Sequence, residues 1–201
     1  MSFKSLIPPT KDTALDFTNI TNTIIPILVY SDGSGFEGGI GASALLFIKD
    51  RLAKVLRCYL GTDKEHTVYE AEGVGLAMEL HLLKGLNRQL IHPMVLGSDS
   101  QALIRALDNQ RSHVGQYILD NIHFFAEQLH AKQDALINHD SCLEALGTNR
   151  SWEGRVKGVI DLQIHRVPGH CNFGLNELAN EEVKKVVEGN SSDTRLLPAF
   201  L

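Results

Sequence analysis

Three acidic residues, Asp32, Glu72 and Asp99, are spaced so that their carboxylates could share one site. Asp32 follows the apolar run at residues 27–30, and Asp99 follows a second apolar run at residues 93–97. In α/β proteins, strand ends of this kind are where the sheet presents chemical groups. Carboxylates that are buried against one another are unfavourable unless cations lie between them. Oxygen ligands of this type suit divalent metal ions, so the pattern predicts a shared metal site.

Glu72 is the acid that a predicted helix turns toward the sheet. From Thr67 onward leucines recur at the i, i+4, i+7 spacing of a helical stripe, beginning with Leu76. With 3.6 residues per turn, Glu72 lies one turn before Leu76 on this stripe and points inward. Glu70 lies off the stripe, and Glu79 lies at its edge about 10 Å further along the axis. Glu72 is therefore the third member expected at the site.

Each aspartate also has a purely structural interpretation. Asp32 could only begin a turn, and Asp99 could only cap a helix. Taken singly, these interpretations are at least as good as the functional one. The inward-facing Glu72 shifts the balance toward a metal site.

The elements around these acids follow the order β-β-β-α-β-α-α-β-α. The predicted strands are residues 27–30, 40–48, 53–60, 93–97 and 159–167, and the predicted helices begin at Thr67 and Ser100 and span residues 114–129 and 176–187. Strands separated by crossover helices imply a mixed sheet covered by helices on both faces. We therefore expect an α/β fold whose five-stranded mixed sheet has three antiparallel strands followed by two parallel strands.

The chain is expected to form one domain over residues 24–188. Residues 1–23, rich in Thr, Pro and Asn, are expected to be a leader or linker, and residues 189–201 a C-terminal tail. Residues 137–158, which include the lone Trp152, lose periodicity and predict an inserted surface loop or short helix.

Composition narrows the possible functions. The 201 residues contain no apolar run long enough for a membrane helix and no secretory signal, which predicts an intracellular, unsecreted protein. The three cysteines lie far apart, and no Cys or His pair has zinc-site spacing. The net charge of −5 argues against nucleic-acid binding by electrostatics alone, so such binding would be local or bridged by metal.

A glycine-rich segment at residues 33–38 matches the dinucleotide-binding pattern G-x-G-x-x-G. That pattern requires a helix directly afterwards, whereas residues 40–48 predict a strand. A tight hairpin turn is the better interpretation of the glycines at residues 33–38. Residues 31–35 also predict a turn directly after the first strand.

Four segments, in order along the chain, resemble the successive motifs of the ribonuclease H family. They are residues 30–34 (YSDGS), 67–72 (TVYEAE), 98–101 (SDSQ) and 167–170 (VPGH). The similarity covers residues 25–188. The residues of the motifs most resemble those of reverse transcriptase-associated RNase H domains of fungal non-LTR retrotransposon polyproteins. An integrase or exonuclease of the same superfold would lack the Pro-Gly-His motif.

The resemblance implies an RNA/DNA-hybrid ribonuclease that hydrolyses the RNA strand endonucleolytically with two Mg²⁺ ions, for which Mn²⁺ could substitute. Asp32, Glu72 and Asp99 would be metal ligands, and His170 would assist product release or proton transfer. The partner would be the RNA/DNA hybrid, and the domain would be a monomer that belongs to a larger retroelement polyprotein.

One position departs from the family pattern. The last motif of the family ends in Asn-Glu-x-Ala-Asp, whereas residues 176–180 read NELAN, which places Asn180 where a fourth metal-binding carboxylate is expected. An amide keeps one coordinating oxygen but removes a negative charge, so it binds a hard cation less well. The resemblance thus implies either an impaired enzyme with Asn180 as a weak ligand, or a catalytically inactive domain that binds nucleic acid or protein.

Overall fold

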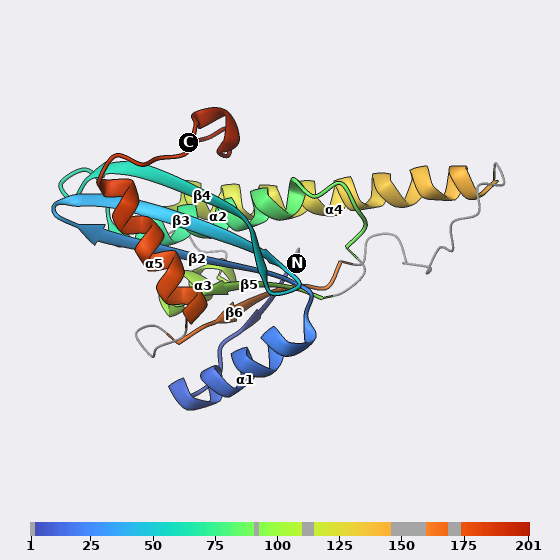
Figure 1. Cartoon of the computed structure of the whole chain (residues 1–201), viewed down its shortest axis with the longest axis horizontal. Helices are drawn as coiled ribbons and strands as arrows, with labels where there is room; N and C mark the ends of the chain where they lie inside the picture. The colour runs from blue at the N-terminus through green and yellow to red at the C-terminus, as the bar shows by residue number, and fades with distance from the viewer. Residues whose placement is uncertain (1–2, 91–92, 110–114, 146–159, 169–173) are drawn as a thin grey trace.

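The computed structural model is a six-stranded mixed sheet in the order β1-β6-β5-β2-β3-β4, with helices on both faces (Figure 1). It describes residues 3–90, 93–109, 115–145, 160–168 and 174–201, of which 137–145 are described as backbone only. The strands are β1 (Lys4–Leu6), β2 (Ile27–Phe36), β3 (Gly39–Ile48), β4 (Arg51–Thr62), β5 (Met94–Ser98) and β6 (Leu162–Arg166). The helices are α1 (Lys11–Ile24), α2 (Val68–Lys84), α3 (Gln101–Leu107), α4 (Gln116–Ala145) and α5 (Gly174–Val187), followed by a 3-10 turn at Thr194–Leu196.

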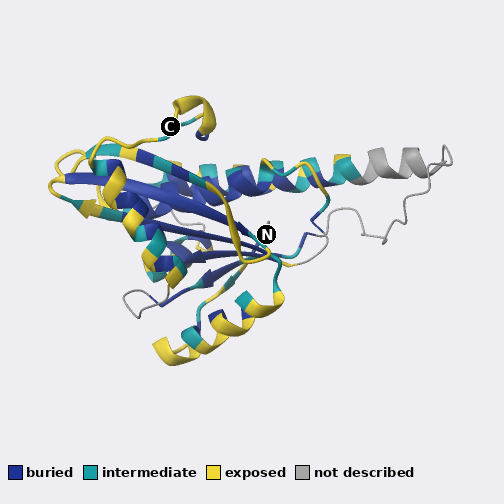
Figure 2. Cartoon of the chain, in the orientation of Figure 1, coloured by how far each residue is buried: buried dark blue, intermediate teal, exposed yellow. Residues whose placement is uncertain are grey.

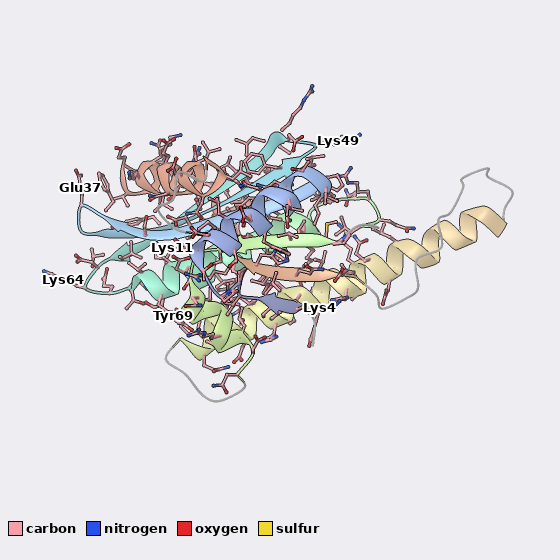
Figure 3. The ribbon with its side chains drawn as sticks, turned by 90° about the horizontal axis from the view of Figure 1, so that it is seen from below. Lys4, Lys11, Glu37, Lys49, Lys64 and Tyr69 are labelled. Atoms are coloured by element: carbon pink, nitrogen blue, oxygen red, sulfur yellow. The ribbon has the colours of Figure 1, made fainter. Side chains whose placement is uncertain are left out.

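Strands β2, β3 and β4 form the antiparallel half of the sheet. Their two-residue turns are residues 37–38 and 49–50, and all four residues have positive φ, as tight hairpins require. Glu37 and Lys49, one from each turn, mark opposite ends of the strands (Figure 3). The turn expected at residues 31–35 was wrong, because β2 continues in extended conformation through that segment to Phe36.

The parallel half of the sheet contains one strand more than the five expected. Strand β5 pairs with β2 and β6, and β1 pairs in parallel with the outer side of β6, with Lys4 opposite Gln163. Residues 1–23 were expected to be a leader or linker, but this part of the chain contains β1 and nearly all of α1. A three-residue strand is too short to show a period-2 pattern, which explains the difference.

Alternate residues of the central strands β2, β3 and β5 face two separate cores, so these strands are largely buried (Figure 2). The larger core contains Val29 and Leu96 from the sheet, packed against α2, α3 and α4. The smaller core contains Leu28 and Val95, packed against α1 and α5. The helices therefore form two layers around the sheet, as the sequence predicted.

Helix α1 is anchored to the smaller core at one face only. Its Asn22 accepts a hydrogen bond from the hydroxyl of the fully buried Tyr30, and the ring of Phe17 contacts that of His165. The opposite face of α1 is exposed (Figure 2).

The end of the chain lies against β4 rather than apart from the domain. The hydroxyls of Ser191 and Ser192 accept hydrogen bonds from the backbone N–H groups of Tyr59 and Arg57, and the ring of Phe200 packs near Phe125 of α4. The segment expected to be a tail thus covers part of an edge strand.

Helix α4 is much longer than the predicted helix at residues 114–129 and projects beyond the sheet (Figure 1). The first part of the expected insertion, residues 137–145, continues this helix, and residues 146–158 lie outside the described part of the chain. Within the described residues, no helix combines the length and apolar character needed to cross a membrane.

Candidate metal centre

The candidate site lies where β2 and β5 separate. The parallel ladder between these strands ends at the pair Tyr30 and Gly97, and β2 then continues with only β3 beside it. Asp32 lies two residues past that last pair, and Asp99 directly follows β5. The two aspartates therefore border the crevice at the carboxyl ends of adjacent parallel strands, the usual place for a site in this fold class.

Helix α2 brings Glu72 to this crevice by a very close approach to β2. A Cβ atom on Gly33 would lie 2.2 Å from the backbone nitrogen of Glu72, so only glycine fits there. The start of α2 is fixed by a capping box in which Thr67 and Glu70 bond each other's backbone N–H groups. Glu70 is thus a capping residue and Glu72 the inward one, as the helical spacing predicted.

Asp32, Glu72 and Asp99 each place a carboxylate oxygen within 4.8 Å of the other two. Asp32 and Glu72 are 6% and 7% exposed, and Asp99 is half-buried. One oxygen of Asp32 and one of Glu72 are buried without a hydrogen-bond partner. Buried, unpartnered carboxylate oxygens that converge in this way suit a hard divalent cation, so the residues fit the metal that the sequence implied.

The protonation of the cluster reflects the same crowding. Burial, and secondarily the charge of Asp99, raise the pKa of Asp32 to about 7. Burial followed by the charges of Asp99 and Asp32 raises the pKa of Glu72 well above its ordinary value. Without a cation the cluster retains protons near neutral pH, and a cation that binds there displaces them.

A cleft of about 470 Å³ opens over the carboxylates, and α5 forms its opposite wall. Asn176, Asn180 and Lys184 line this wall, and Gly35 and Val68 lie at other parts of the rim. Helix α5 packs tightly on β3, where the hydroxyl of Ser43 donates to the carbonyl oxygen of Ala179.

Asn180, expected as the weak fourth ligand, does lie at the cleft. Its carbonyl oxygen accepts a hydrogen bond of 3.3 Å from the hydroxyl of Ser34. His170, the remaining site residue expected from sequence, lies outside the described residues. The structural alternatives for the two aspartates do not hold, because Asp32 lies inside a strand and Ser100, rather than Asp99, caps α3.

Two residues of the helices that border the site, Lys184 on α5 and Glu79 on α2, were not singled out from the sequence. Lys184 lines the cleft, one turn after Asn180 on α5, and the i, i+4 spacing could have indicated it. Glu79 is completely buried on α2, away from the cleft, and burial raises its pKa well above the ordinary value. Its stripe-edge position gave no sign of complete burial.

The chain resembles solved RNase H structures, whereas no protein-family model and no curated protein sequence matches it. It is 15% identical to LC11-RNase H1 in complex with an RNA/DNA hybrid, with 80% of this chain and 99% of that chain covered and a TM-score of 0.52. LC11-RNase H1 was isolated from compost by a metagenomic approach. The N-terminal RNase H domain of Rv2228c from Mycobacterium tuberculosis is also 15% identical, with coverages of 81% and 96% and a TM-score of 0.52. The chain therefore has the RNase H-like fold.

Proposed function

We propose that this protein is a metal-dependent ribonuclease of the RNase H type that cuts the RNA strand of an RNA/DNA hybrid. The observation that carries the proposal is the convergence of Asp32, Glu72 and Asp99 at the crevice between β2 and β5. These are also the three residues that the resemblance of the sequence motifs to the RNase H family implied as metal ligands. The crystallised complex of LC11-RNase H1 with a hybrid supports the choice of substrate.

The three carboxylates would hold a divalent cation, with Mg²⁺ the expected ion and Mn²⁺ a substitute. Such an ion supplies Lewis acidity toward a phosphate and activates water for attack. Asp32 and Glu72 contribute because their burial keeps bulk water away from the ligand oxygens, while the half-buried Asp99 opens toward the cleft. The unequal burial makes Asp99 the ligand best placed to adjust when substrate enters.

A second candidate is a domain that binds a hybrid without cutting it. Asn180 favours this candidate, because an amide at that position supplies no negative charge toward a cation. The retroelement origin, the monomeric state and the role of His170 remain predictions from the motifs, and neither candidate depends on them.

The test is cleavage of a labelled RNA/DNA hybrid with Mg²⁺, with Mn²⁺ or with EDTA, beside single-stranded RNA. We expect metal-dependent cutting of the hybrid alone, reduced by about 100-fold or more in Asp99→Asn, since a ligand charge is lost. Asp50→Asn is the matched control, because it makes the same change in the β3–β4 turn, where positive φ suits asparagine.

Two outcomes would count against catalysis. Hybrid binding without cleavage in any metal would favour the non-cleaving candidate. Cleavage that Asp99→Asn leaves intact would place the activity elsewhere than in the carboxylate cluster.

A further inference from the structure

The wall of the cleft opposite the carboxylates is a single stripe of α5. Asn176, Asn180 and Lys184 are spaced at i, i+4 and i+8, so they lie on one face of the helix, and all three line the cleft. Glu177 lines it as well, and both Glu177 and Lys184 are exposed to solvent. The stripe therefore consists of two amides and one ammonium group, directly across from three carboxylates.

The Asn180 side chain is partly engaged. Its carbonyl oxygen accepts a hydrogen bond from the Ser34 hydroxyl. Its NH₂ group is a donor with no counterpart in a carboxylate, and it is suited to an anionic oxygen rather than to a cation. At this position α5 thus offers a hydrogen-bond donor where a carboxylate would have offered a metal ligand.

Asn176 gives independent evidence that the stripe is built for a ligand. Its side chain is 6% exposed, and its carbonyl oxygen is buried without a hydrogen-bond partner. Leaving such an atom unsatisfied costs free energy. It gains a partner when a ligand or water enters the cleft.

Lys184 and its neighbour Lys185 have different surroundings. Lys185 forms an ion pair with Glu182 on the side of α5 away from the cleft, and Glu182 also pairs with Arg57 of β4. Lys184 lines the cleft, and its charge is felt by Asp32. Two lysines that are adjacent in sequence thus differ in whether their charge lies at the site.

The charges on the two walls favour one divalent cation, on the sheet side of the cleft. Three carboxylates converge there, whereas the α5 wall carries Glu177 and Lys184, whose opposite charges cancel. A second divalent ion on the α5 side would lie beside Lys184, whose charge repels it, and at position 180 it would meet a neutral amide, which attracts it less than a carboxylate would.

We propose that this site holds one divalent cation instead of two, and that the Lys184 ammonium and the Asn180 amide contact the substrate phosphate where a second cation would otherwise lie. The cation count concerns the free protein, whereas the phosphate contact rests on the proposed function. A carboxylate at position 180 would bind a second cation, and that cation would place positive charge beside the phosphate. In this chain the Lys184 ammonium supplies that positive charge instead.

The first experiment counts Mn²⁺ ions and measures their affinity by electron paramagnetic resonance on the free protein. We expect one ion for the unaltered chain, and one ion bound roughly fivefold more tightly in Lys184→Met, since a nearby like charge is removed. Lys185→Met, the matched control, should change affinity less than about twofold, because that charge lies outside the cleft and is already paired.

The second part of the experiment restores the missing charge. Asn180→Asp alone should still bind one ion, because the new carboxylate lies one turn from Lys184 and would pair with it. The double variant Asn180→Asp/Lys184→Met should bind two. Two ions on the unaltered chain, one ion on the double variant, or equal effects of the two lysine variants would each overturn the proposal.

A separate measurement tests the phosphate contact without any metal. Fluorescence anisotropy of a labelled RNA/DNA hybrid in EDTA should show that Lys184→Met weakens binding at least about fivefold more than Lys185→Met does. Equal weakening would refute the contact. If the chain bound no hybrid at all, the proposed function would fail, whereas the Mn²⁺ count would still decide the one-cation site.

Discussion

At the residue scale, the site depends on carboxylates that are buried before any ligand arrives. The convergence of Asp32, Glu72 and Asp99 could be predicted because each acid adjoins an apolar run of clear period. The α5 wall could not be predicted in the same way. The family motif has a carboxylate at position 180, so Asn180 was interpreted only as a weak replacement for that metal ligand. That the Ser34 hydroxyl engages its oxygen depends on a contact between residues 146 positions apart.

Glu79 shows that burial of an acid is not confined to the site. It is fully buried on α2, and neither of its oxygens makes a hydrogen bond of normal geometry. Because the folded state holds the proton of Glu79 to a higher pH than the unfolded chain does, the folded state binds more protons in that window. Stability therefore falls as pH rises above about 4.5, the ordinary pKa of glutamate.

We expect Glu79→Gln to raise the free energy of unfolding at pH 8 by about 1 to 3 kcal/mol and to change it little near pH 4.5. The reason is that the amide has no proton to lose. Urea unfolding in EDTA across this pH range measures the effect, and Glu127→Gln on the exposed side of α4 is the control. Parallel pH profiles for Glu79→Gln and the unaltered chain would contradict the expectation.

At the element scale, small residues set how closely the helices approach the sheet. On one face Gly33 and Gly75 let β2 and α2 meet, and on the other Gly39 and Gly41 of β3 lie against α5. Glycines, which have no side chain, thus allow the helices on both walls of the cleft to lie close to the sheet. The period of the helices and strands was readable from sequence, whereas the glycines of β2 were interpreted as a turn because glycine signals turns as readily as close packing.

Gly33→Ala should lower the free energy of unfolding by about 3 kcal/mol or more and weaken Mn²⁺ binding. Its Cβ would collide with the α2 backbone and push Glu72 away from Asp32. Chemical denaturation and Mn²⁺ titration check the two effects. Gly174→Ala is the control, because a Cβ there meets no atom within 4 Å, and a similar loss in both variants would count against close packing as the cause.

At the scale of the whole molecule, two segments far apart in the sequence occupy the edges of the sheet. Strand β1 forms one edge, and residues 191–192 bind to β4 at the other. Three antiparallel strands, the crossover helices and two parallel strands were predictable, because each has a strong local pattern. Strand β1 and the docking of residues 191–200 were not, because they depend on partners far away in sequence. Short segments acquire their structure from what they pack against.

Phe3 provides a test of how firmly the N-terminal segment belongs to the fold. It is 4% exposed and its ring stacks on His123 of α4. We expect Phe3→Ala to lower the free energy of unfolding by about 3 kcal/mol, as for a buried aromatic residue. Ile24→Ala, at a 73% exposed position, should change it by less than about 0.5 kcal/mol. A dispensable leader would give two equally small values in the same denaturation assay.

The pairing of β1 with β6 also orders events during protein synthesis. Lys4 is made some 159 residues before its partner Gln163. At typical translation rates of about 5 to 20 residues per second, β1 waits for many seconds before its neighbour exists. During that time the nascent chain can form the β2–β3–β4 hairpins and α2, so β1, which is translated before the other described strands, can pair only after β6 has been made.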